Sequence, residues 1–550
     1  MLEGFVPWPE AFARRYRARG YWEDRPLGAV LTEALARHSH REALIFRDER
    51  VSFLELNQRI DRLARYLLDL EVRPLDRVVM QLPNWPAFAY LYFALVRVGA
   101  IPVMALPPHR QREIGYFLTF TDAVGYAVPG TFGRFDYPAL AAEIRQVAPT
   151  LRHVFVAGEP CPAGYIALDA VPEPRHTQAD LEVRSTALDP MEPAVFQLSG
   201  GTTGLPKIIP RTHNDYVFNS KGFAPIHAMD AGTVLLVVLP IAHNFALASP
   251  GIQGCLLNGG RVVLSDSPRA EAAFPLIERE RITHLELVPA LLIQWLHDAT
   301  LLRHDVSSVR VINTGGQKLQ PEVKRLARQR FPNALVQEVF GMAEGLLCCP
   351  RLDDPKEVLI ETVGRPMCPD DEVRLVDDDE QDVPEGAIGE LIVRGPYTLR
   401  GYYKAADYNA TAFTAEGFYK TGDLMRWHRS GNLIVEGRKK DLINRGGEKI
   451  SAEEVENLIL GHAAVKNVAC VAVPDPVLGE RMCACVVPRP GARLALDDLC
   501  AYLLQQGIAK FKLPERLEIF DDLPLVPGFN KVAKKVLREL LAQKAQSRAG

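Results

Sequence analysis

The chain has 550 residues, with 64 Lys and Arg against 68 Asp and Glu, so its formal net charge is −4 at pH 7. This balance argues against a dedicated nucleic-acid-binding protein, which would normally have a basic domain or stripe. With 47% hydrophobic and 24% charged residues, the composition also excludes a disordered, collagen-like or coiled-coil chain. From length alone we expect about three to four structural units.

The cysteines and the apolar stretches bear on the cellular compartment. Nine cysteines are scattered along the chain, with no pair of C-x-x-C units at zinc spacing, so we expect reduced thiols in a cytoplasmic protein. The first 22 residues contain no apolar core and are not expected to be a signal peptide. Two apolar stretches, 90–107 and 234–250, are interrupted by Arg97 and by His243 and Asn244, so we predict buried core there and not membrane spans.

Hydrophobic periodicity predicts alternating helices and strands in the first two thirds of the chain. From residue 53, the run FLELNQRIDRLARYLLDL carries apolar residues at helical spacing. Short β-rich runs alternate with such segments, at 76–82, 260–265, 283–288 and 309–316. This alternation predicts parallel βαβ units, with sheets that helices cover on both faces.

The pattern changes at about residue 371. The runs EVRLVD, GELIVRG and NLIVEGR are short alternating strands separated by Gly, Asp and Pro, which predicts an antiparallel β-rich region. A further α/β unit follows, with a predicted helix at AEEVENLILGH and a strand at NVACVAVP. The polar segment 437–441 lies between the two β patterns and is the predicted domain boundary, the alternative being an ordinary surface loop.

The segment LSGGTTGLPK, residues 198–207, is the first candidate for chemistry. It follows an apolar run and combines three glycines, three hydroxyl side chains and Lys207 in one loop. Glycines let backbone N–H groups turn toward an anion, and hydroxyls and a lysine add donors, so the loop is suited to hold phosphates. It does not fit the Walker A pattern, and the chain contains no G-x-G-x-x-G. The alternative is a flexible Gly/Thr turn.

Three further motifs are weaker when each is taken alone. Glu344 follows a predicted strand in FGMAEG, where a carboxylate near a triphosphate could ligate Mg²⁺ or simply be solvated. Asp423 ends the YKTGD segment, where a turn-borne carboxylate could accept from ribose hydroxyls or form an Asx turn. The fourth motif is GRKKDLINRGGEKI, residues 437–450.

Together and in this order, the motifs resemble the adenylate-forming superfamily, which includes acyl-CoA synthetases, luciferases and the adenylation domains of nonribosomal peptide synthetases. The resemblance covers about residues 5–541. Within it, the chain is most similar to the stand-alone aryl-acid–AMP ligases of siderophore pathways, which activate 2,3-dihydroxybenzoate or salicylate. The stretches that carry this resemblance are FVPWPEAFARRY, LPPHRQREIGYF, QLSGGTTGLPKIIPRTHNDY, LPIAHNFALASPG, QEVFGMAEGLL, RLDDP, VRGPYTLRGYYKA and INRGGEKISAEEVEN.

The resemblance implies an α/β fold with a large N-terminal adenylating domain of covered sheets plus a β-rich subdomain (1–437), a hinge (438–441) and a small mobile C-terminal α+β lid domain (442–550). The implied activity is the joining of an aryl acid to the AMP part of ATP with release of pyrophosphate, followed by transfer to the phosphopantetheine thiol of an aryl carrier protein. ATP and Mg²⁺ are the implied cofactors, and neither nucleic acid nor membrane is an expected partner. The reaction brings two negative groups together, so cations must offset their repulsion.

The resemblance also implies roles for individual residues. The expected ATP-binding residues are Ser199, Gly200, Gly201, Thr202, Thr203, Gly204, Lys207, Gly316, Gln317, Phe340, Gly341, Met342, Ala343, Asp423, Arg438 and Lys531. The expected aryl-acid residues are His243, Asn244, Phe245, Ser249, Gly315 and Leu347. Glu344 is the expected Mg²⁺ ligand, Lys440 the hinge residue, and Lys531 and His243 the catalytic residues.

Two of these assignments depart from simple matching. Lys531 follows Asn530 where the family usually has Gly, in a loop that is one residue longer, and Asn tolerates positive φ well enough to keep the turn. The alternative is that Lys531 is one of several solvated lysines of a basic C-terminal helix. His243 has a role near the substrate carboxylate by its motif position, the alternative being a packed core histidine.

The identity of the acid is left open by two residues. Ser249 stands where 2,3-dihydroxybenzoate activators usually have Ser and salicylate activators Cys, whereas Leu347 resembles the bulkier residue of the salicylate type. We favour 2,3-dihydroxybenzoate, because a buried phenol left unpaired costs about 1–3 kcal/mol. Cys348 and Cys349 are interpreted as core residues, although adjacent thiols also suit a metal or redox site.

Two alternatives to carrier-dependent ligation remain open. An aromatic acyl-CoA ligase would use free CoA as the acceptor. A non-catalytic homologue that binds an aryl acid is favoured only by the altered loop around Lys531.

Overall fold

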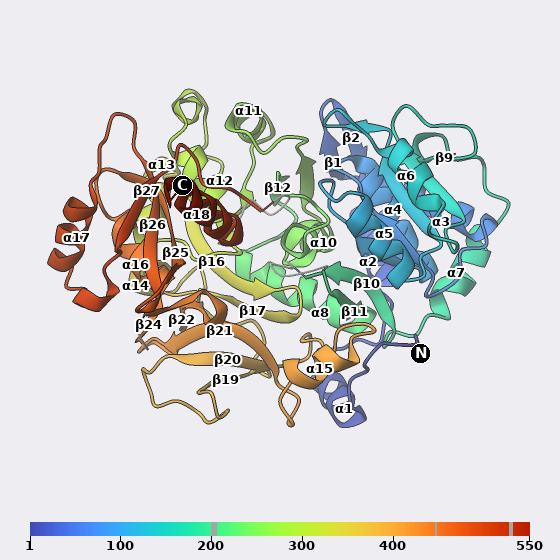
Figure 1. Ribbon diagram of the computed structural model, residues 1–550. Helices are drawn as coiled ribbons and strands as arrows, with labels where there is room; N and C mark the ends of the chain where they lie inside the picture. The colour runs from blue at the N-terminus through green and yellow to red at the C-terminus, as the bar shows by residue number, and fades with distance from the viewer. Residues whose placement is uncertain (200–205, 446–447, 527–531, 550) are drawn as a thin grey trace.

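The computed structural model describes residues 1–199, 206–445, 448–526 and 532–549 (Figure 1). Within these residues, no helix is both long enough and apolar enough to cross a membrane. The two apolar stretches instead form α4 and β4, and β12 and α9, as predicted for core. All nine cysteines lie in the described part, and none forms a disulfide.

The large sheet has parallel strands at its centre and antiparallel pairs at both edges. Three of the predicted β-rich runs form its strands β13, β14 and β15. The order is β18 (Arg365–Pro366), β17 (Gly345–Cys349), β16 (Leu335–Met342), β15 (Val311–Gly315), β14 (His284–Leu287), β12 (Val234–Val237), β13 (Arg261–Leu264), β1 (Glu42–Phe46) and β2 (Glu49–Ser52).

The second sheet is also parallel except for its β10–β11 edge. Its order is β11 (Ile208–Thr212), β10 (Pro193–Leu198), β4 (Ile101–Met104), β3 (Arg77–Met80), β5 (Gly125–Pro129), β8 (His153–Ala157) and β9 (Ile166–Ala167). A short hairpin, β6 (Thr131–Phe132) and β7 (Phe135–Asp136), lies outside it.

Helices cover these sheets, as the alternating pattern predicts. The helix expected from residue 53 is α3, which begins at a capping box formed by Ser52 and Glu55. The helices are α1 (Glu10–Ala18), α2 (Leu27–Arg37), α3 (Phe53–Asp69), α4 (Pro86–Val98), α5 (Gln111–Phe120), α6 (Tyr137–Arg145), α7 (Gln178–Thr186), α8 (His213–Phe223), α9 (Asn244–Ala248), α10 (Gly251–Leu257), α11 (Ala270–Glu280), α12 (Pro289–Leu296), α13 (Pro321–Arg330), α14 (Lys356–Glu361), α15 (Ala406–Ala412), α16 (Ala452–Leu460), α17 (Leu496–Gln505) and α18 (Lys534–Ala549). Short 3₁₀ turns are η1 (Leu168–Ala170), η2 (Ala224–His227), η3 (Ala299–Arg303), η4 (Lys439–Asp441) and η5 (Lys510–Lys512).

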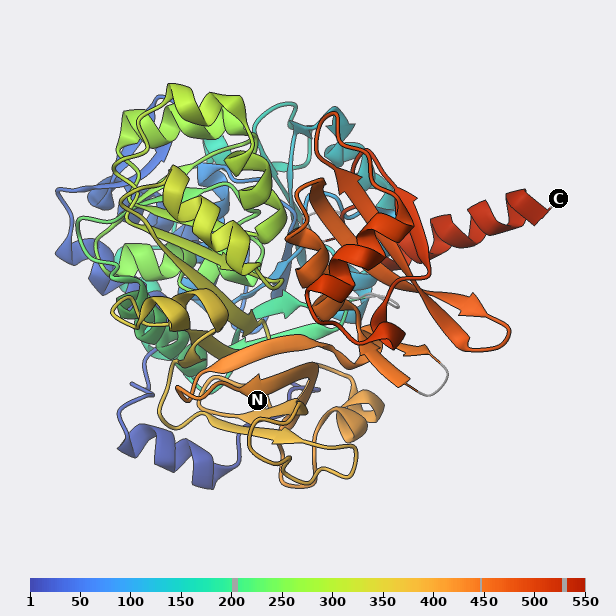
Figure 2. The same cartoon turned by 90° about the vertical axis from the view of Figure 1, so that its left-hand side faces the viewer.

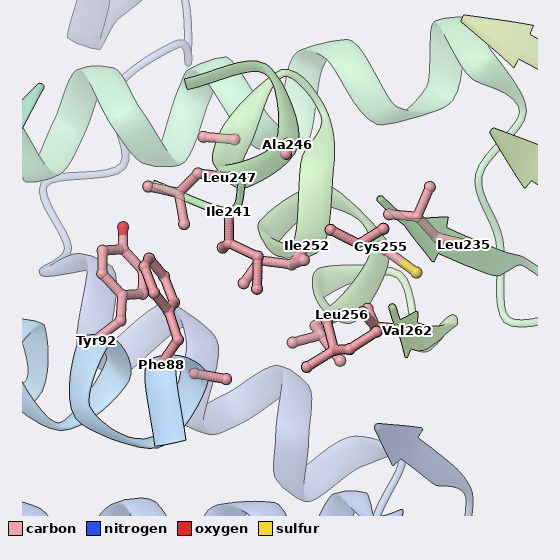
Figure 3. Packing of buried hydrophobic residues seen from close by; sticks show 14 of the residues in the cluster. Phe88, Tyr92, Leu235, Ile241, Ala246, Leu247, Ile252, Cys255, Leu256 and Val262 are labelled. Atoms are coloured by element: carbon pink, nitrogen blue, oxygen red, sulfur yellow. The ribbon is translucent and has the colours of Figure 1, made fainter. Parts of the chain in front are cut away.

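One apolar core joins the two sheets through α2, α3, α4 and α10. Figure 3 shows part of it, where Phe88 and Tyr92 of α4 lie near Leu247 of α9 and Ile252 of α10. Burial of this many apolar side chains fixes α9 and α10 against the body of the protein. The short helix α9, which carries expected acid-binding residues, is therefore held in place by the apolar core.

The β-rich region and the C-terminal unit form two further sheets. The antiparallel sheet has the order β19 (Glu372–Val376), β20 (Gly389–Arg394), β21 (Tyr419–Trp427) and β22 (Leu433–Arg438), which confirms the predicted antiparallel region. The C-terminal sheet has the order β24 (Glu448–Ser451), β23 (Leu442–Arg445), β26 (Gly479–Pro488) and β25 (Val465–Asp475), with β27 (Arg516–Ile519) paired to β26. Figure 2 shows this C-terminal unit, in orange and red, beside the larger part of the molecule.

Candidate active site

The base of the loop 198–207 is closed by two hydrogen bonds. β10 ends at Leu198 and β11 begins at Ile208, so the hairpin sets Ser199 opposite Lys207. The Ser199 N–H donates to the Lys207 carbonyl at 2.9 Å, and the Lys207 N–H donates to Ser199 Oγ at 2.9 Å. The expected phosphate-binding residues Gly200, Gly201, Thr202, Thr203 and Gly204 lie outside the described residues, and their role stays a prediction.

A group of tyrosines connects Lys207 to Glu344. The Lys207 ammonium lies over the rings of Tyr408 and Tyr402, at 4.1 and 5.3 Å from their centroids. The Tyr402 hydroxyl donates to Glu344 Oε1 at 2.7 Å and lies 2.9 Å from the Tyr419 hydroxyl. Burial and the neighbouring carboxylate raise the pKa of Tyr402 well above its usual value, so it remains a donor. Two side chains that the sequence placed in one site therefore do lie close together.

The turn that carries Glu344 is shaped by the glycine after it. Glu344 lies between β16 and β17, and its carbonyl accepts from the Leu399 N–H at 2.7 Å. Gly345 has φ +140°, and a Cβ there would come 2.4 Å from Thr398 Cα, so only glycine fits. Among the described residues, Glu344 Oε2 has no hydrogen bond, and a carboxylate oxygen with this access suits a Mg²⁺ that is also held by phosphate oxygens.

Asp423 and Arg438 form an ion pair between neighbouring strands. They are register partners on β21 and β22, and Arg438 Nε lies 2.8 Å from Asp423 Oδ1. The carboxylate raises the pKa of Arg438, which holds its positive charge in place. The expectation that Asp423 lies in a turn is wrong: it is a strand residue. Gly422, with φ +71°, and a register shift after Leu424 distort the strand here, which explains the turn-like sequence.

Several of the expected ATP-binding residues lie at the carboxyl ends of two neighbouring parallel strands. Gly316 and Gln317 follow β15, and the run from Phe340 to Met342 ends β16, followed by Ala343. Gly315 is the register partner of Val339, so the residues that follow each of them lie at one edge of the large sheet. Gly341 faces Leu347 of β17, and a Cβ at Gly341 would come 2.5 Å from Leu347 Cδ2.

The expected acid-binding residues gather around α9. His243 caps the helix, because its Nδ1 accepts from the Phe245 N–H at 3.3 Å, which leaves the proton of the neutral ring on Nε2. Asn244 and Ser249 are buried, and Asn244 Nδ2 donates to Ser249 Oγ at 3.1 Å. A Cβ on Gly315 would contact the ring of Phe245 at 3.8 Å, so the end of β15 adjoins α9.

Leu347 joins this region from the opposite side. It is 2% exposed and packs in a cluster that includes Phe223 of α8 and Val339 of β16. Val339 is the register partner of Gly315, so Leu347 is one side chain away from the α9 residues. Cys348 and Cys349 are buried, and burial raises their pKa values well above the usual range, which supports their interpretation as core.

A supporting layer behind the acid residues was missed by the sequence. The Tyr216 hydroxyl donates to Asn244 Oδ1 at 2.7 Å, and Gln197 Nε2 donates to the Tyr216 hydroxyl at 3.0 Å. Asn219 Nδ2 donates to the Ala248 carbonyl at 2.6 Å and reaches Ser249 Oγ at 3.5 Å. Tyr216 and Asn219 are three residues apart on α8, a helical spacing that was the available signal.

Two predictions concern residues that the structure leaves untested. Lys531 lies outside the described residues, so its catalytic role stays a prediction. The backbone of Lys440 lies in η4, where the chain passes from the antiparallel sheet to the C-terminal sheet, and its side chain is not described. The hinge role and the domain limits 1–437, 438–441 and 442–550 likewise stay predictions.

Comparison with known proteins decides the family. Residues 31–403 match the model of the AMP-binding enzyme, and residues 454–528 match that of the AMP-binding enzyme C-terminal domain. The chain belongs to the AMP-binding enzymes. This membership confirms the expected superfamily and gives the enzyme a nucleotide substrate, ATP.

The curated relatives of this AMP-binding enzyme match over nearly its whole length. It is 46% identical to the 2,3-dihydroxybenzoate-AMP ligase of Bacillus subtilis (strain 168), covering 99% of each chain. It is 47% identical to a salicylyl-CoA synthase / salicylate adenylyltransferase of Streptomyces sp, again over 99% of each. It is 44% identical to the salicyl-AMP ligase / salicyl-S-ArCP synthetase of Mycobacterium tuberculosis (strain ATCC 25618 / H37Rv), over 98% and 95% of the two chains.

The solved structures agree on the fold. The apo structure of MbtA from Mycobacterium smegmatis is 42% identical, covers 98% of each chain and superposes with a TM-score of 0.73. The AMP-binding enzyme thus has the adenylate-forming fold, with a large N-terminal part of mixed sheets and a small C-terminal domain, as predicted.

Proposed function

We propose that this AMP-binding enzyme is an aryl-acid–AMP ligase of siderophore biosynthesis. It joins an aryl acid to ATP, releases pyrophosphate, and passes the aryl group to the phosphopantetheine thiol of an aryl carrier protein. The observation that carries the proposal is the buried pair of Asn244, on α9, and Ser249, directly after α9, next to the sheet edge where the nucleotide motifs end. Two adjacent polar groups in an apolar setting suit a flat ring with hydroxyl substituents.

The described residues divide the work of binding and orientation. Lys207 supplies positive charge to the phosphates of ATP, and the Asp423–Arg438 pair binds the ribose hydroxyls. Glu344, fixed by the Tyr402 hydroxyl, holds Mg²⁺, which supplies charge neutralisation to the phosphates when bound. His243 donates from Nε2 to the substrate carboxylate and keeps it oriented toward the α-phosphate.

Hydrogen-bond accounting favours 2,3-dihydroxybenzoate over salicylate. Because Tyr216 donates to Asn244 Oδ1, the Asn244 amide must present its NH₂ group to Ser249. Ser249 Oγ also accepts from Asn219, so the Ser249 proton is available for an oxygen at position 3 of the ring. Leu347 was the residue that indicated salicylate. It packs against Gly341, and because Gly341 has no side chain there is room for the leucine.

A pyrophosphate-exchange panel tests the function. The acids are benzoate, salicylate, 2,3-dihydroxybenzoate, 6-methylsalicylate and 3-hydroxypicolinate, each with ATP and Mg²⁺. We expect the highest kcat/KM with 2,3-dihydroxybenzoate and the next with salicylate. Exchange with none of the five acids would refute the proposed activity, and would favour the non-catalytic homologue.

The second candidate function is an aromatic acyl-CoA ligase. It is favoured by the relative that is named a salicylyl-CoA synthase. Comparing thioester yield from free CoA with the yield from a phosphopantetheinylated aryl carrier protein separates the two. Faster transfer of the aryl group to CoA would show that CoA, and not the carrier protein, is the acceptor.

We also propose a cytoplasmic location. The reaction consumes ATP, and the nine unpaired cysteines suit a reducing compartment.

A further inference from the structure

A buried arginine lies between the α9 residues and the turn that carries Glu344. Arg211 is on β11, directly after the Lys207 loop, and its side chain is fully buried. Its Nε pairs with Asp215 Oδ1 at 2.9 Å, and both side chains are 0% exposed. A buried guanidinium is costly unless each of its N–H groups has a partner, so the remaining partners define what this residue holds.

The first contact leads to Ser249. Arg211 Nη2 donates to Asn219 Oδ1 at 3.3 Å. Since that oxygen accepts from a cation, the Asn219 amide must turn its NH₂ group toward α9, where it meets the Ala248 carbonyl and Ser249 Oγ. Arg211 thereby fixes the orientation of the amide that supports Ser249.

The second contact leads to Asn244. The Arg211 guanidinium lies 4.8 Å from the centroid of the Tyr216 ring, a cation–π distance. The hydroxyl of the same tyrosine holds Asn244 Oδ1. Both polar residues of the acid region are therefore supported through neighbours of Arg211.

The third contact leads to the expected metal ligand. Arg211 Nη1 donates to the carbonyl of Ala343 at 2.9 Å, one residue before Glu344. Nη2 donates to the Tyr397 carbonyl at 3.2 Å, at the start of the segment whose Leu399 N–H holds the Glu344 carbonyl. The fork thus clamps both sides of the Glu344 turn.

We propose that Arg211 is a positioning residue that sets the acid-binding pair and the Glu344 turn from one point, so that affinity for the aryl acid and for Mg²⁺–ATP depends on the same side chain. The inference rests on the proposed function, because it takes α9 as the acid site. A lysine cannot replace the arginine here. The planar guanidinium reaches partners in three directions, whereas a lysine has a single ammonium group that cannot reach all of them.

The test compares Arg211→Lys with Arg97→Lys, measured by calorimetric titration and thermal unfolding of the full chain. Arg97 is a matched control, a buried arginine that pairs with Asp61 and Asn57 on α3. We expect Arg211→Lys to weaken binding of 2,3-dihydroxybenzoate and of Mg²⁺–ATP, each by about tenfold, as charged hydrogen bonds are lost. Arg97→Lys should lower Tm by a similar amount and leave both Kd values within about twofold of wild type.

A second variant separates the contact that leads to Ser249 from the contact that leads to Glu344. Asn219→Ala removes the link to Ser249 but keeps Arg211 on Ala343, so acid affinity should fall while Mg²⁺–ATP affinity stays unchanged. Unchanged acid affinity in Asn219→Ala overturns the proposal, and this holds even where Arg211→Lys fails to fold. Unchanged Kd values in Arg211→Lys, with only a lower Tm, overturn it as well.

The nucleotide titration keeps this inference distinct from the proposed function. It needs no acid, so it reports on Arg211 whichever acid is used. A wild-type enzyme that binds Mg²⁺–ATP but exchanges with no aryl acid would refute the function alone.

Discussion

Replacing Ser249 with cysteine should shift the preference of the enzyme from 2,3-dihydroxybenzoate toward salicylate. Ser249 is 2% exposed, and its Oγ accepts from the amides of Asn244 at 3.1 Å and Asn219 at 3.5 Å, which leaves its proton for the 3-hydroxyl of the substrate. A thiol is a weak donor, so the buried 3-hydroxyl loses its partner at a cost of about 1–3 kcal/mol. This cost corresponds to a change of roughly 5- to 150-fold in the ratio of the two kcat/KM values.

The assay is pyrophosphate exchange with each acid under identical ATP and Mg²⁺ concentrations. The readout is the ratio of the two kcat/KM values. The thiol of Ser249→Cys is also a weaker acceptor for the Asn244 and Asn219 amides, which lowers activity with both acids and leaves this effect out of the ratio. Ser265→Cys serves as the control, since Ser265 is another buried serine whose hydroxyl bonds the Ser267 carbonyl at 2.7 Å. A Ser249→Cys enzyme with the wild-type ratio would remove Ser249 from the selectivity argument.

Three further predictions concern the nucleotide side and stability. Lys531→Ala should abolish adenylate formation but spare transfer from supplied aryl-adenylate, and equal loss of both half-reactions would contradict a role limited to adenylation. Tyr402→Phe keeps the aromatic ring but removes the 2.7 Å bond to Glu344, so the Mg²⁺ concentration for half-maximal activity should rise about fivefold, and an unchanged value would show that this bond does not support the metal ligand. Glu286 is buried and accepts a hydrogen bond from the Gly251 N–H, and burial raises its pKa from 4.5 to about 8, so the stability it contributes is present below about pH 4.5 and is lost as the pH rises to 8. Thermal unfolding of Glu286→Gln should therefore show a Tm gain over wild type that grows from pH 5 to 8 and then levels off, and a constant difference would mean that the carboxyl does not titrate in this range.

Local patterns were enough to predict most of the fold. The helix at α3 and the strands β13 to β15 follow from periodicity, because their apolar residues recur at the spacing of one buried face. Asp423 shows the limit: glycine and aspartate read as a turn, yet cross-strand pairing with Arg438 keeps the segment in β21. Propensity is a local property, and sheet pairing overrides it.

The sequence motifs predicted the residues that are proposed to contact the substrates, but not the residues that support them. Residues such as Glu344 and Ser249 occur in motifs, so their types and spacing announce chemistry. Arg211 carries no such signal, because its partners Ala343 and Tyr397 are 132 and 186 positions away in the sequence. The sequence alone does not reveal which distant carbonyls a buried guanidinium will meet.

The seating of α9 on α8 has a consequence for engineering. α9 is a helix of five residues whose polar side chain, Asn244, is held by Tyr216 of α8, while Ser249, which directly follows the helix, is held by Asn219 of α8. Gln197 of β10 in turn donates to the Tyr216 hydroxyl. Grafting the α9 sequence of another ligase into this scaffold would introduce new acid-binding side chains without the residues that orient them. To transfer acid preference, the graft would also have to include the residues at positions 197, 216 and 219.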